Sequence, residues 1–245
     1  MRILIVNPNT SAAMTALIEE CGRAAASART QVEAVHPAMG PASIESHYDE
    51  ALAVPGLLAE IARAEEAGTA DAYVVACFGD PGLDAARELA SGPVVGVAEA
   101  AMRTACYLGR AFSVVTTLGR TTGRAWDLAA HYGAGRFCRN VRACEIPVLE
   151  LDDPASDARA RITEECRRAV AEDGIDALVL GCAGMADLAT AIAKDVGVPV
   201  VDGVAAGVRT AETLVALGLA TGARGEFARP PRKPYAGLLA DFQIR

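Results

Sequence analysis

Two cysteines, Cys77 and Cys182, lie 105 residues apart in matching contexts within this chain of 245 residues. Each follows a short apolar run of the β type and precedes a turn that contains glycine, Phe78–Asp80 or Ala183–Met185. If the two contexts face each other, one thiolate removes a proton from a carbon acid and the opposite thiol returns one to the other face. The pair therefore predicts a two-base racemase.

The sequence around the cysteines is an internal repeat. A strand led by proline follows each cysteine, and the two prolines, Pro93 and Pro199, are 106 residues apart. The first strands of the two halves also match loosely, at residues 3–6 and 112–115. Two nearly equal offsets in matching strand–turn–helix–strand contexts indicate two similar α/β lobes around a cleft.

The elements that must position the cysteines are short apolar runs alternating with alanine-rich segments of helical period. Strands are predicted at residues 3–6, 32–35, 73–76, 94–97, 112–115, 141–146, 177–180 and 198–201. Helices are predicted at residues 11–26, 55–67, 81–90, 99–108, 126–132, 158–171, 187–194 and 204–217. We expect Asp80 to cap the helix that starts at Pro81. Continuous apolar strands alternating with helices favour an α/β fold with a mainly parallel four-stranded sheet in each lobe.

The domain organisation follows from the repeat. Residues 1–97 together with about 204–228 are predicted to form the first lobe, because the last helix is expected to cross back. Residues 98–203 form the second lobe, and 229–245 form a proline-rich tail expected to be extended.

The carboxyl ends of parallel strands are where open α/β sheets bind ligands, so both cysteines are expected to face the cleft. A helix N-terminus stabilises a thiolate, and we expect at least one of the two thiols to be partly ionised near neutral pH. Backbone N–H groups of the two glycine turns are expected to hold the developing enolate oxygen. Polar residues also end the first strand of each lobe and serve either as helix caps or as substrate ligands: Asn7, Asn9, Thr10, Thr116 and Thr117.

Composition excludes several classes of protein. Apolar residues make up 52% of the chain and charged residues 22%, which is enough for a sizeable core, and the net charge of −8 disfavours nucleic-acid and anionic-membrane surfaces. There is no C-x-x-C pair and no short histidine spacing, so no metal is expected. Dinucleotide, P-loop, serine-hydrolase and zincin motifs are absent. Without a signal segment or a long apolar run, we expect a cytoplasmic protein with free thiols and a small-molecule partner.

Five segments of the chain match a known family. They are residues 7–11, 41–45, 76–83, 112–117 and 180–185. With these motifs the sequence resembles the aspartate/glutamate racemase superfamily, in particular its hydantoin racemase branch, which also contains allantoin racemases. The resemblance implies two pseudo-symmetric flavodoxin-like lobes with the active site in the cleft between them, and an activity that needs neither metal nor organic cofactor. We also expect a homo-oligomer.

The resemblance assigns roles to individual residues. It implies that Cys77 and Cys182 are the acid/base pair. It further implies a substrate pocket lined by Asn7, Thr10, Ser43, Phe78, Gly79, Thr116, Thr117, Gly184 and Met185. Asp80 and Ala183 belong to the same two turns and complete the set of candidate substrate-binding residues.

Departures from the family pattern bear on the substrate. Glutamate and aspartate racemases carry Asn-Thr after the first cysteine, and the glutamate enzymes typically carry Thr-His after the second; here Phe78-Gly79 and Ala183-Gly184 stand there, so the groups that would hold a free amino acid are missing. Many hydantoin racemases have an acidic residue where this chain has Gly79, but the glycine version also occurs in allantoin-type members. The expected substrate is a 5-substituted hydantoin, with allantoin of purine catabolism as the alternative. A non-catalytic two-lobed binding protein is the third possibility.

Overall fold

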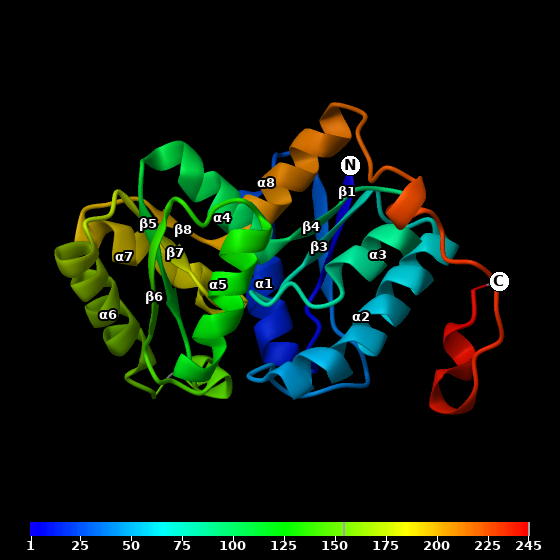
Figure 1. Cartoon of the computed structure of the whole chain (residues 1–245), viewed down its shortest axis with the longest axis horizontal. Coiled ribbons are helices and arrows are strands. Elements are labelled where there is room, and N and C mark those ends of the chain that lie inside the picture. The colour runs from blue at the N-terminus through cyan, green and yellow to red at the C-terminus, as the bar shows by residue number, and fades with distance from the viewer. Residues whose placement is uncertain (154, 245) are drawn as a thin grey trace.

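Two α/β lobes lie side by side in the computed structural model, which describes residues 1–153 and 155–244 (Figure 1). The first sheet has the strand order β2-β1-β3-β4 and the second β6-β5-β7-β8, with every pairing parallel. The strands are β1 (Arg2–Val6), β2 (Gln31–Val35), β3 (Ala72–Val75), β4 (Val94–Gly96), β5 (Phe112–Thr116), β6 (Cys138–Ala143), β7 (Ala177–Leu180) and β8 (Val200–Val201). The predicted fold class, two similar lobes with parallel four-stranded sheets, is confirmed.

The internal repeat extends to individual backbone hydrogen bonds. The N–H of Tyr73 in β3 donates to the carbonyl of Pro93 at 2.9 Å, and the N–H of Leu178 in β7 donates to Pro199 at 2.9 Å. The donors are 105 residues apart and the acceptors 106, as the sequence offsets predict. The same local pattern therefore builds the same strand pairing twice.

In the described part of the chain eight α-helices cover the sheets, and all residues of strands β1, β3, β5 and β7 except Arg2 are buried. The helices are α1 (Ala12–Ala25), α2 (His47–Ala67), α3 (Leu83–Leu89), α4 (Val97–Leu108), α5 (Thr122–His131), α6 (Ala158–Asp173), α7 (Ala189–Val196) and α8 (Gly203–Ala216). Short 3-10 helices are Gly119–Thr121, Val148–Asp152, Ala183–Leu188, Gly225–Phe227 and Gly237–Phe242. None of the described helices is long and apolar enough to cross a membrane.

Helix α8 follows the last strand of the second sheet but packs against α1, α4 and β3. Its buried face supplies Val204, Val208 and Ala211 to a core that includes Ile5 and Val74 of the first sheet. Near its end, the buried carboxylate of Glu212 accepts a hydrogen bond of 2.8 Å from the N–H of Ser27, just after α1. A C-terminal helix thus covers one face of the N-terminal sheet.

Several helix starts differ from those predicted: α5 begins at Thr122 and not at residue 126, α4 and α7 begin two residues away from their predicted starts, and α2 and α3 also differ. Helix α2 begins at His47, where Ser46 accepts a hydrogen bond from the N–H of Asp49, and Pro55 lies inside the helix rather than at its first position. Helix α3 begins at Leu83 and not at Pro81. Asp80 does not cap it, because its carboxylate points instead to the start of α4. The N–H groups of Ala98 and Glu99 lie close to this carboxylate in space, so its position just before Pro81 in the sequence is misleading.

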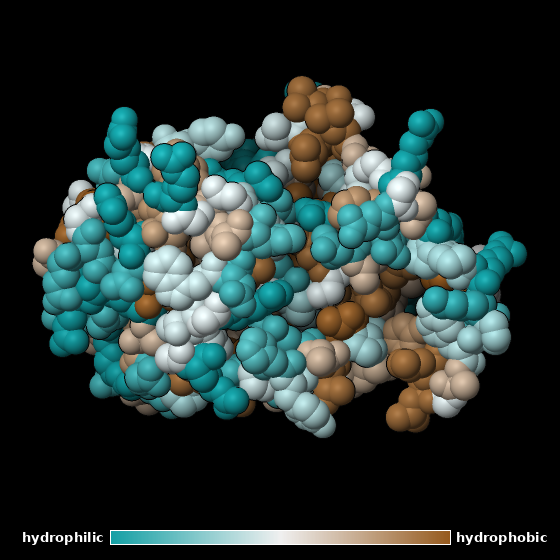
Figure 2. Space-filling view, viewed as in Figure 1, coloured by the Kyte–Doolittle hydropathy of each residue, from teal (hydrophilic) through white to brown (hydrophobic). Residues whose placement is uncertain are grey.

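The C-terminal segment runs beside α2 and α3 and encloses a groove of about 800 Å³ with them (Figure 1). The prediction of a wholly extended tail is wrong for residues Gly237–Phe242, which form a 3-10 helix; residue 245 of the predicted tail lies outside the described residues. Figure 2 shows apolar surface beside this groove and over the end of α8, where Leu217 and Leu219 are exposed.

Candidate active site

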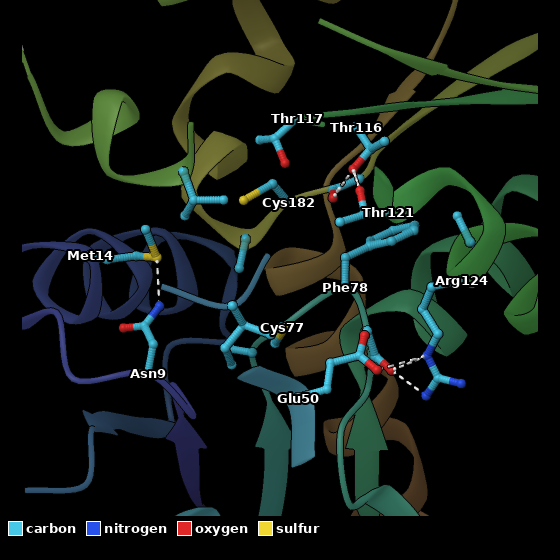
Figure 3. A pocket seen from close by; sticks show the side chains of 17 residues that line it. Asn9, Met14, Glu50, Cys77, Phe78, Thr116, Thr117, Thr121, Arg124 and Cys182 are labelled. Carbon is cyan, nitrogen blue, oxygen red and sulfur yellow. Dashed lines mark hydrogen bonds and ion pairs between the residues drawn. The ribbon is translucent and has the colours of Figure 1, made fainter. Parts of the chain in front are cut away.

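A pocket of about 60 Å³ lies between the lobes, where strands β3, β5 and β7 reach their carboxyl ends (Figure 3). Cys77 follows β3 and Cys182 follows β7, and both line this pocket. Figure 3 shows them on facing walls, one from each lobe. The two turns are closed in the same way: Asp80 N–H donates to the Cys77 carbonyl at 2.9 Å, and Met185 N–H donates to the Cys182 carbonyl at 3.1 Å.

The Cys77 thiol is held in its neutral form. Burial, and to a lesser extent the nearby Cys182, Glu50 and Asp80, raise its pKa to about 12, against the opposing effect of a hydrogen bond from the N–H of Gly79. Cys77 is therefore not the partly ionised thiol, and the expectation that at least one of the two thiols is partly ionised near neutral pH stays a prediction. The reason for Cys77 is positional, because α3 starts only at Leu83 and places no helix N-terminus at this sulfur. Cys182, by contrast, directly precedes the 3-10 helix Ala183–Leu188.

The structure brings five of the predicted substrate-binding residues to the pocket, and they come from both lobes. They are Phe78, Gly79, Thr116, Thr117 and Ala183. Thr116 donates its hydroxyl to the Gly181 carbonyl at 3.0 Å, which ties the ends of β5 and β7 together beside Cys182. Asn9, one of the polar residues that end the first strand, also lines the pocket, where its amide donates to the sulfur of Met14 at 3.3 Å.

The structure places the other six candidates away from the pocket lining. The buried Asn7 amide donates to Asn9 at 2.8 Å and to Thr15 at 3.0 Å, which fixes the turn after β1. The Thr10 hydroxyl donates to the Pro41 carbonyl at 3.4 Å. Ser43 lies in the loop before α2, next to Ile44, which does line the pocket.

Gly184 and Met185 follow Cys182 in the second lobe. Met185 is fully buried in the core that contains Ile146 and Leu178. Gly184 packs against Leu151 and Met14, and a Cβ on it would come within 3.1 Å of the Leu151 side chain. Met185 therefore anchors the turn in the core of the second lobe, and a Cβ on Gly184 would also meet the pocket-lining side chains of Met14 and Cys182, at 3.3 and 3.7 Å.

Asp80 is buried, with 3% exposure, and its carboxylate accepts hydrogen bonds from three donors. Its carboxylate accepts from the N–H of Ala98 at 3.1 Å, from the N–H of Glu99 at 2.9 Å and from the hydroxyl of Tyr132 at 2.7 Å. Burial raises its pKa to about 6, against the lowering effect of these hydrogen bonds. Its side chain thus lies between the lobes instead of facing the pocket.

Two charged residues of the pocket wall are not found by the sequence patterns. Glu50 lies in the first turn of α2, upstream of the predicted helix start at Pro55, and Arg124 lies at the start of α5. Arg124 donates to the Gly79 carbonyl through Nη2 at 2.7 Å and Nε at 3.2 Å, and its Nε is 3.6 Å from Glu50 Oε2. A cap at Ser46 is the available signal for Glu50, whereas nothing local marks Arg124.

The described residues contain no group of three or more His, Cys, Asp or Glu side chains that could hold a metal ion. The pocket instead offers two facing thiols, the hydroxyls of three threonines and one guanidinium–carboxylate pair: Thr116, Thr117, Thr121, Arg124 and Glu50. This set is suited to moving a proton and to hydrogen-bonding a neutral polar ring.

Comparisons with known proteins agree on one family. The chain matches the Asp/Glu/Hydantoin racemase family over residues 3–211. It is 47% identical over 242 residues to a hydantoin racemase of Pseudomonas sp. (strain NS671), covering 99% of this chain and 97% of the relative. A hydantoin racemase of Rhizobium meliloti is 48% identical over 237 residues, covering 97% and 98%. The structure is similar to that of allantoin racemase from Klebsiella pneumoniae, with a TM-score of 0.97, 47% identity and 99% coverage of both chains.

Proposed function

Because this chain belongs to the Asp/Glu/hydantoin racemase family, we propose that it is a cofactor-independent racemase of 5-substituted hydantoins in which Cys77 and Cys182 form the acid/base pair. The observation that carries the proposal is the position of the two thiols on facing walls of one small pocket. A hydantoin has an acidic C–H at C5, next to a ring carbonyl, and needs only proton transfer to invert that centre.

The proposed step keeps atoms and charge balanced. One thiolate takes the C5 proton and becomes a thiol, while the C–H electron pair delocalises onto the neighbouring carbonyl as an enolate. The opposite thiol then gives its proton to the other face of C5 and becomes the thiolate. Hydroxyl groups of the pocket, including that of Thr117 beside Cys182, are candidates to hydrogen-bond the ring oxygens (Figure 3). The reverse reaction exchanges the roles of the two cysteines.

Allantoin is the second candidate substrate, and one observation favours it. Its ureido group offers N–H donors and a carbonyl acceptor, which are complementary to the Glu50 carboxylate and the Arg124 guanidinium of the pocket wall. The solved relative from Klebsiella pneumoniae is named an allantoin racemase. Loss of optical rotation measured on (S)-allantoin and on 5-benzylhydantoin, at matched enzyme concentrations, distinguishes the two candidates.

Single replacements test the two-cysteine mechanism. Cys77→Ser and Cys182→Ser are each expected to lower racemisation by about 10²–10⁴, because serine is far too weak a base to replace a thiolate. Each variant should still exchange the C5 proton of one enantiomer for deuterium, and the two variants should prefer opposite enantiomers. Cys106→Ser in α4 is the matched control and should racemise like the wild type.

Three outcomes contradict the proposal. Near wild-type racemisation by either variant would exclude the cysteine pair. Exchange of the same enantiomer by both variants would indicate a single base. Binding without any exchange at C5 would leave a ligand-binding protein without turnover.

A further inference from the structure

Helix α5 of the second lobe reaches the loop that carries Cys77 at two points. Near its start, Arg124 donates through two nitrogens to the carbonyl of Gly79, at 2.7 and 3.2 Å. Directly after its end, Tyr132 donates its hydroxyl to the carboxylate of Asp80 at 2.7 Å. Two consecutive loop residues of one lobe are thus held by one helix of the other.

The contact of Tyr132 with Asp80 is internal, whereas the Arg124 side chain is 32% exposed, and the two contacts fix a demanding backbone. Asp80 and Tyr132 are exposed by only 3% and 8%. Asp80 has a φ of 44°, in the left-handed region that side chains other than glycine rarely adopt. Gly96 packs against the carboxylate, since a Cβ there would come within 2.4 Å of it. Such a conformation persists only where the surroundings hold it in place.

The held residues are in turn bonded to Cys77. The N–H of Asp80 donates to the Cys77 carbonyl at 2.9 Å, and the N–H of Gly79 donates to the Cys77 thiol. A shift of either loop residue therefore moves the cysteine backbone or withdraws a donor from its sulfur.

The Cys182 turn is supported differently. The residue at the repeat position of Asp80 is Met185, which is fully buried and offers no carboxylate to the other lobe. From the first lobe this turn meets a methyl group, as the Met14 Cε atom lies 3.3 Å from the position of a Cβ on Gly184. The polar connection from α5 therefore serves one member of the cysteine pair.

We propose that Arg124 and Tyr132 are positioning residues for Cys77, so that proton transfer on the Cys77 face of the substrate depends on helix α5 of the opposite lobe. This inference rests on the proposed two-cysteine racemisation. Neither residue is assigned a proton-transfer role.

Racemisation rates cannot reveal the asymmetry. The two enantiomers are equally stable, so kcat/KM must fall equally in both directions whichever face is impaired. Deuterium exchange in single-cysteine backgrounds separates the faces, since Cys182→Ser leaves Cys77 and Cys77→Ser leaves Cys182. Tyr132→Phe and Arg124→Gln are introduced into each background, and kcat and KM for exchange are measured separately.

With Cys77 as the remaining base, we expect kcat for exchange to fall about tenfold in Tyr132→Phe and about tenfold or more in Arg124→Gln, because each replacement removes charge-assisted hydrogen bonding to the loop. With Cys182 as the remaining base, kcat should change by less than about twofold. The exposed residues Tyr107 and Arg120 provide the controls Tyr107→Phe and Arg120→Gln, which should change neither rate. Arg124→Lys, which keeps the charge but not the two-pronged contact, should fall between wild type and Arg124→Gln.

Equal losses of kcat in both backgrounds overturn the inference, because they report general disruption of the fold. A rise in KM alone, in both backgrounds, also overturns it and makes Arg124 a substrate ligand. An unchanged kcat for exchange in the Cys182→Ser background, where Cys77 is the remaining base, also overturns the inference. If the wild type racemises no hydantoin or allantoin, the proposed function fails and this inference falls with it, whereas the other results leave the function intact.

Discussion

Glu50 lies so close to Gly79 that a Cβ on residue 79 would come within 2.5 Å of the Glu50 oxygen Oε1. The glycine carbonyl accepts two hydrogen bonds from Arg124, whose Nε lies 3.6 Å from the same carboxylate. Glycine at this position therefore leaves the space in which the Glu50 carboxylate stands. An acidic side chain at this position would occupy that space and add a second negative charge beside Cys77.

Gly79→Ala is expected to lower racemisation about tenfold while changing the free energy of unfolding by less than about 1 kcal/mol, because the group that must move is the far end of a flexible side chain. Polarimetry gives the rate and urea unfolding gives the stability. Gly222→Ala is the control, since an added Cβ there meets nothing within 4 Å. Full activity in Gly79→Ala would show that the placement of Glu50 is irrelevant to turnover.

Proton abstraction by Cys77 is expected to accelerate with pH. With a pKa of about 12, the thiolate fraction of Cys77 rises nearly tenfold for each pH unit across neutrality. The exchange rate of Cys182→Ser, which retains only Cys77, should therefore climb steadily from pH 7 to 9 after subtraction of the uncatalysed rate. A plateau at neutral pH would mean that bound substrate creates the thiolate at a much lower pH.

Asp80 should make the stability of the protein depend on pH in an unusual direction. Its folded pKa, about 6, lies above the unfolded value of about 3.9, so the folded state holds this proton more tightly. Its contribution to stability is fully present below about pH 4 and is lost as the pH rises through about 6. The free energy of unfolding of wild type minus that of Asp80→Asn should thus decrease between pH 4 and 7 in urea titrations. A constant or increasing difference would contradict this assignment.

Glu212 is expected to be the polar anchor of α8. Burial alone would raise its pKa, but hydrogen bonds from Thr30, Ser27 and Arg209 outweigh burial and hold the pKa below its usual value. Glu212→Ala should cost about 1.5–3 kcal/mol, because the hydrogen bonds that this buried carboxylate accepts from Ser27, Thr30 and Arg209 are lost. The exposed Glu226 supplies the control Glu226→Ala, which should change stability by less than about 0.5 kcal/mol. A loss below 1 kcal/mol in Glu212→Ala would show that apolar packing alone holds α8.

The sequence is sufficient for features that local patterns determine. The strands around Cys77 and Cys182 are short apolar runs with nearly the same spacing to a following proline, so the amino-acid sequence alone reveals their equivalence. The register between Tyr73 and Pro93 follows from that spacing. The parallel arrangement of the strands can also be predicted from the sequence, because a helix separates each strand from the next.

The contacts of α5 lie beyond the reach of sequence. Arg124 and Tyr132 act across the lobe boundary, and which faces of the two lobes meet is decided by packing of the whole chain. Asp80 illustrates the limit: its position before Pro81 is typical of a helix cap, but the carboxylate bonds to residues 18 and 19 positions later and to a tyrosine 52 positions later. Glu50 is missed for a smaller reason, because the sequence pattern places the helix start at Pro55.

The return of α8 to the first sheet has a consequence for biosynthesis. The residues that complete that core, Val204, Val208 and Ala211, are translated more than 100 residues after β4. Until they leave the ribosome, the growing chain carries a sheet with an uncovered apolar face, which is the kind of surface that chaperones bind and that aggregates. The second lobe is contiguous in sequence and can fold before α8, the last helix of the first lobe, has been translated.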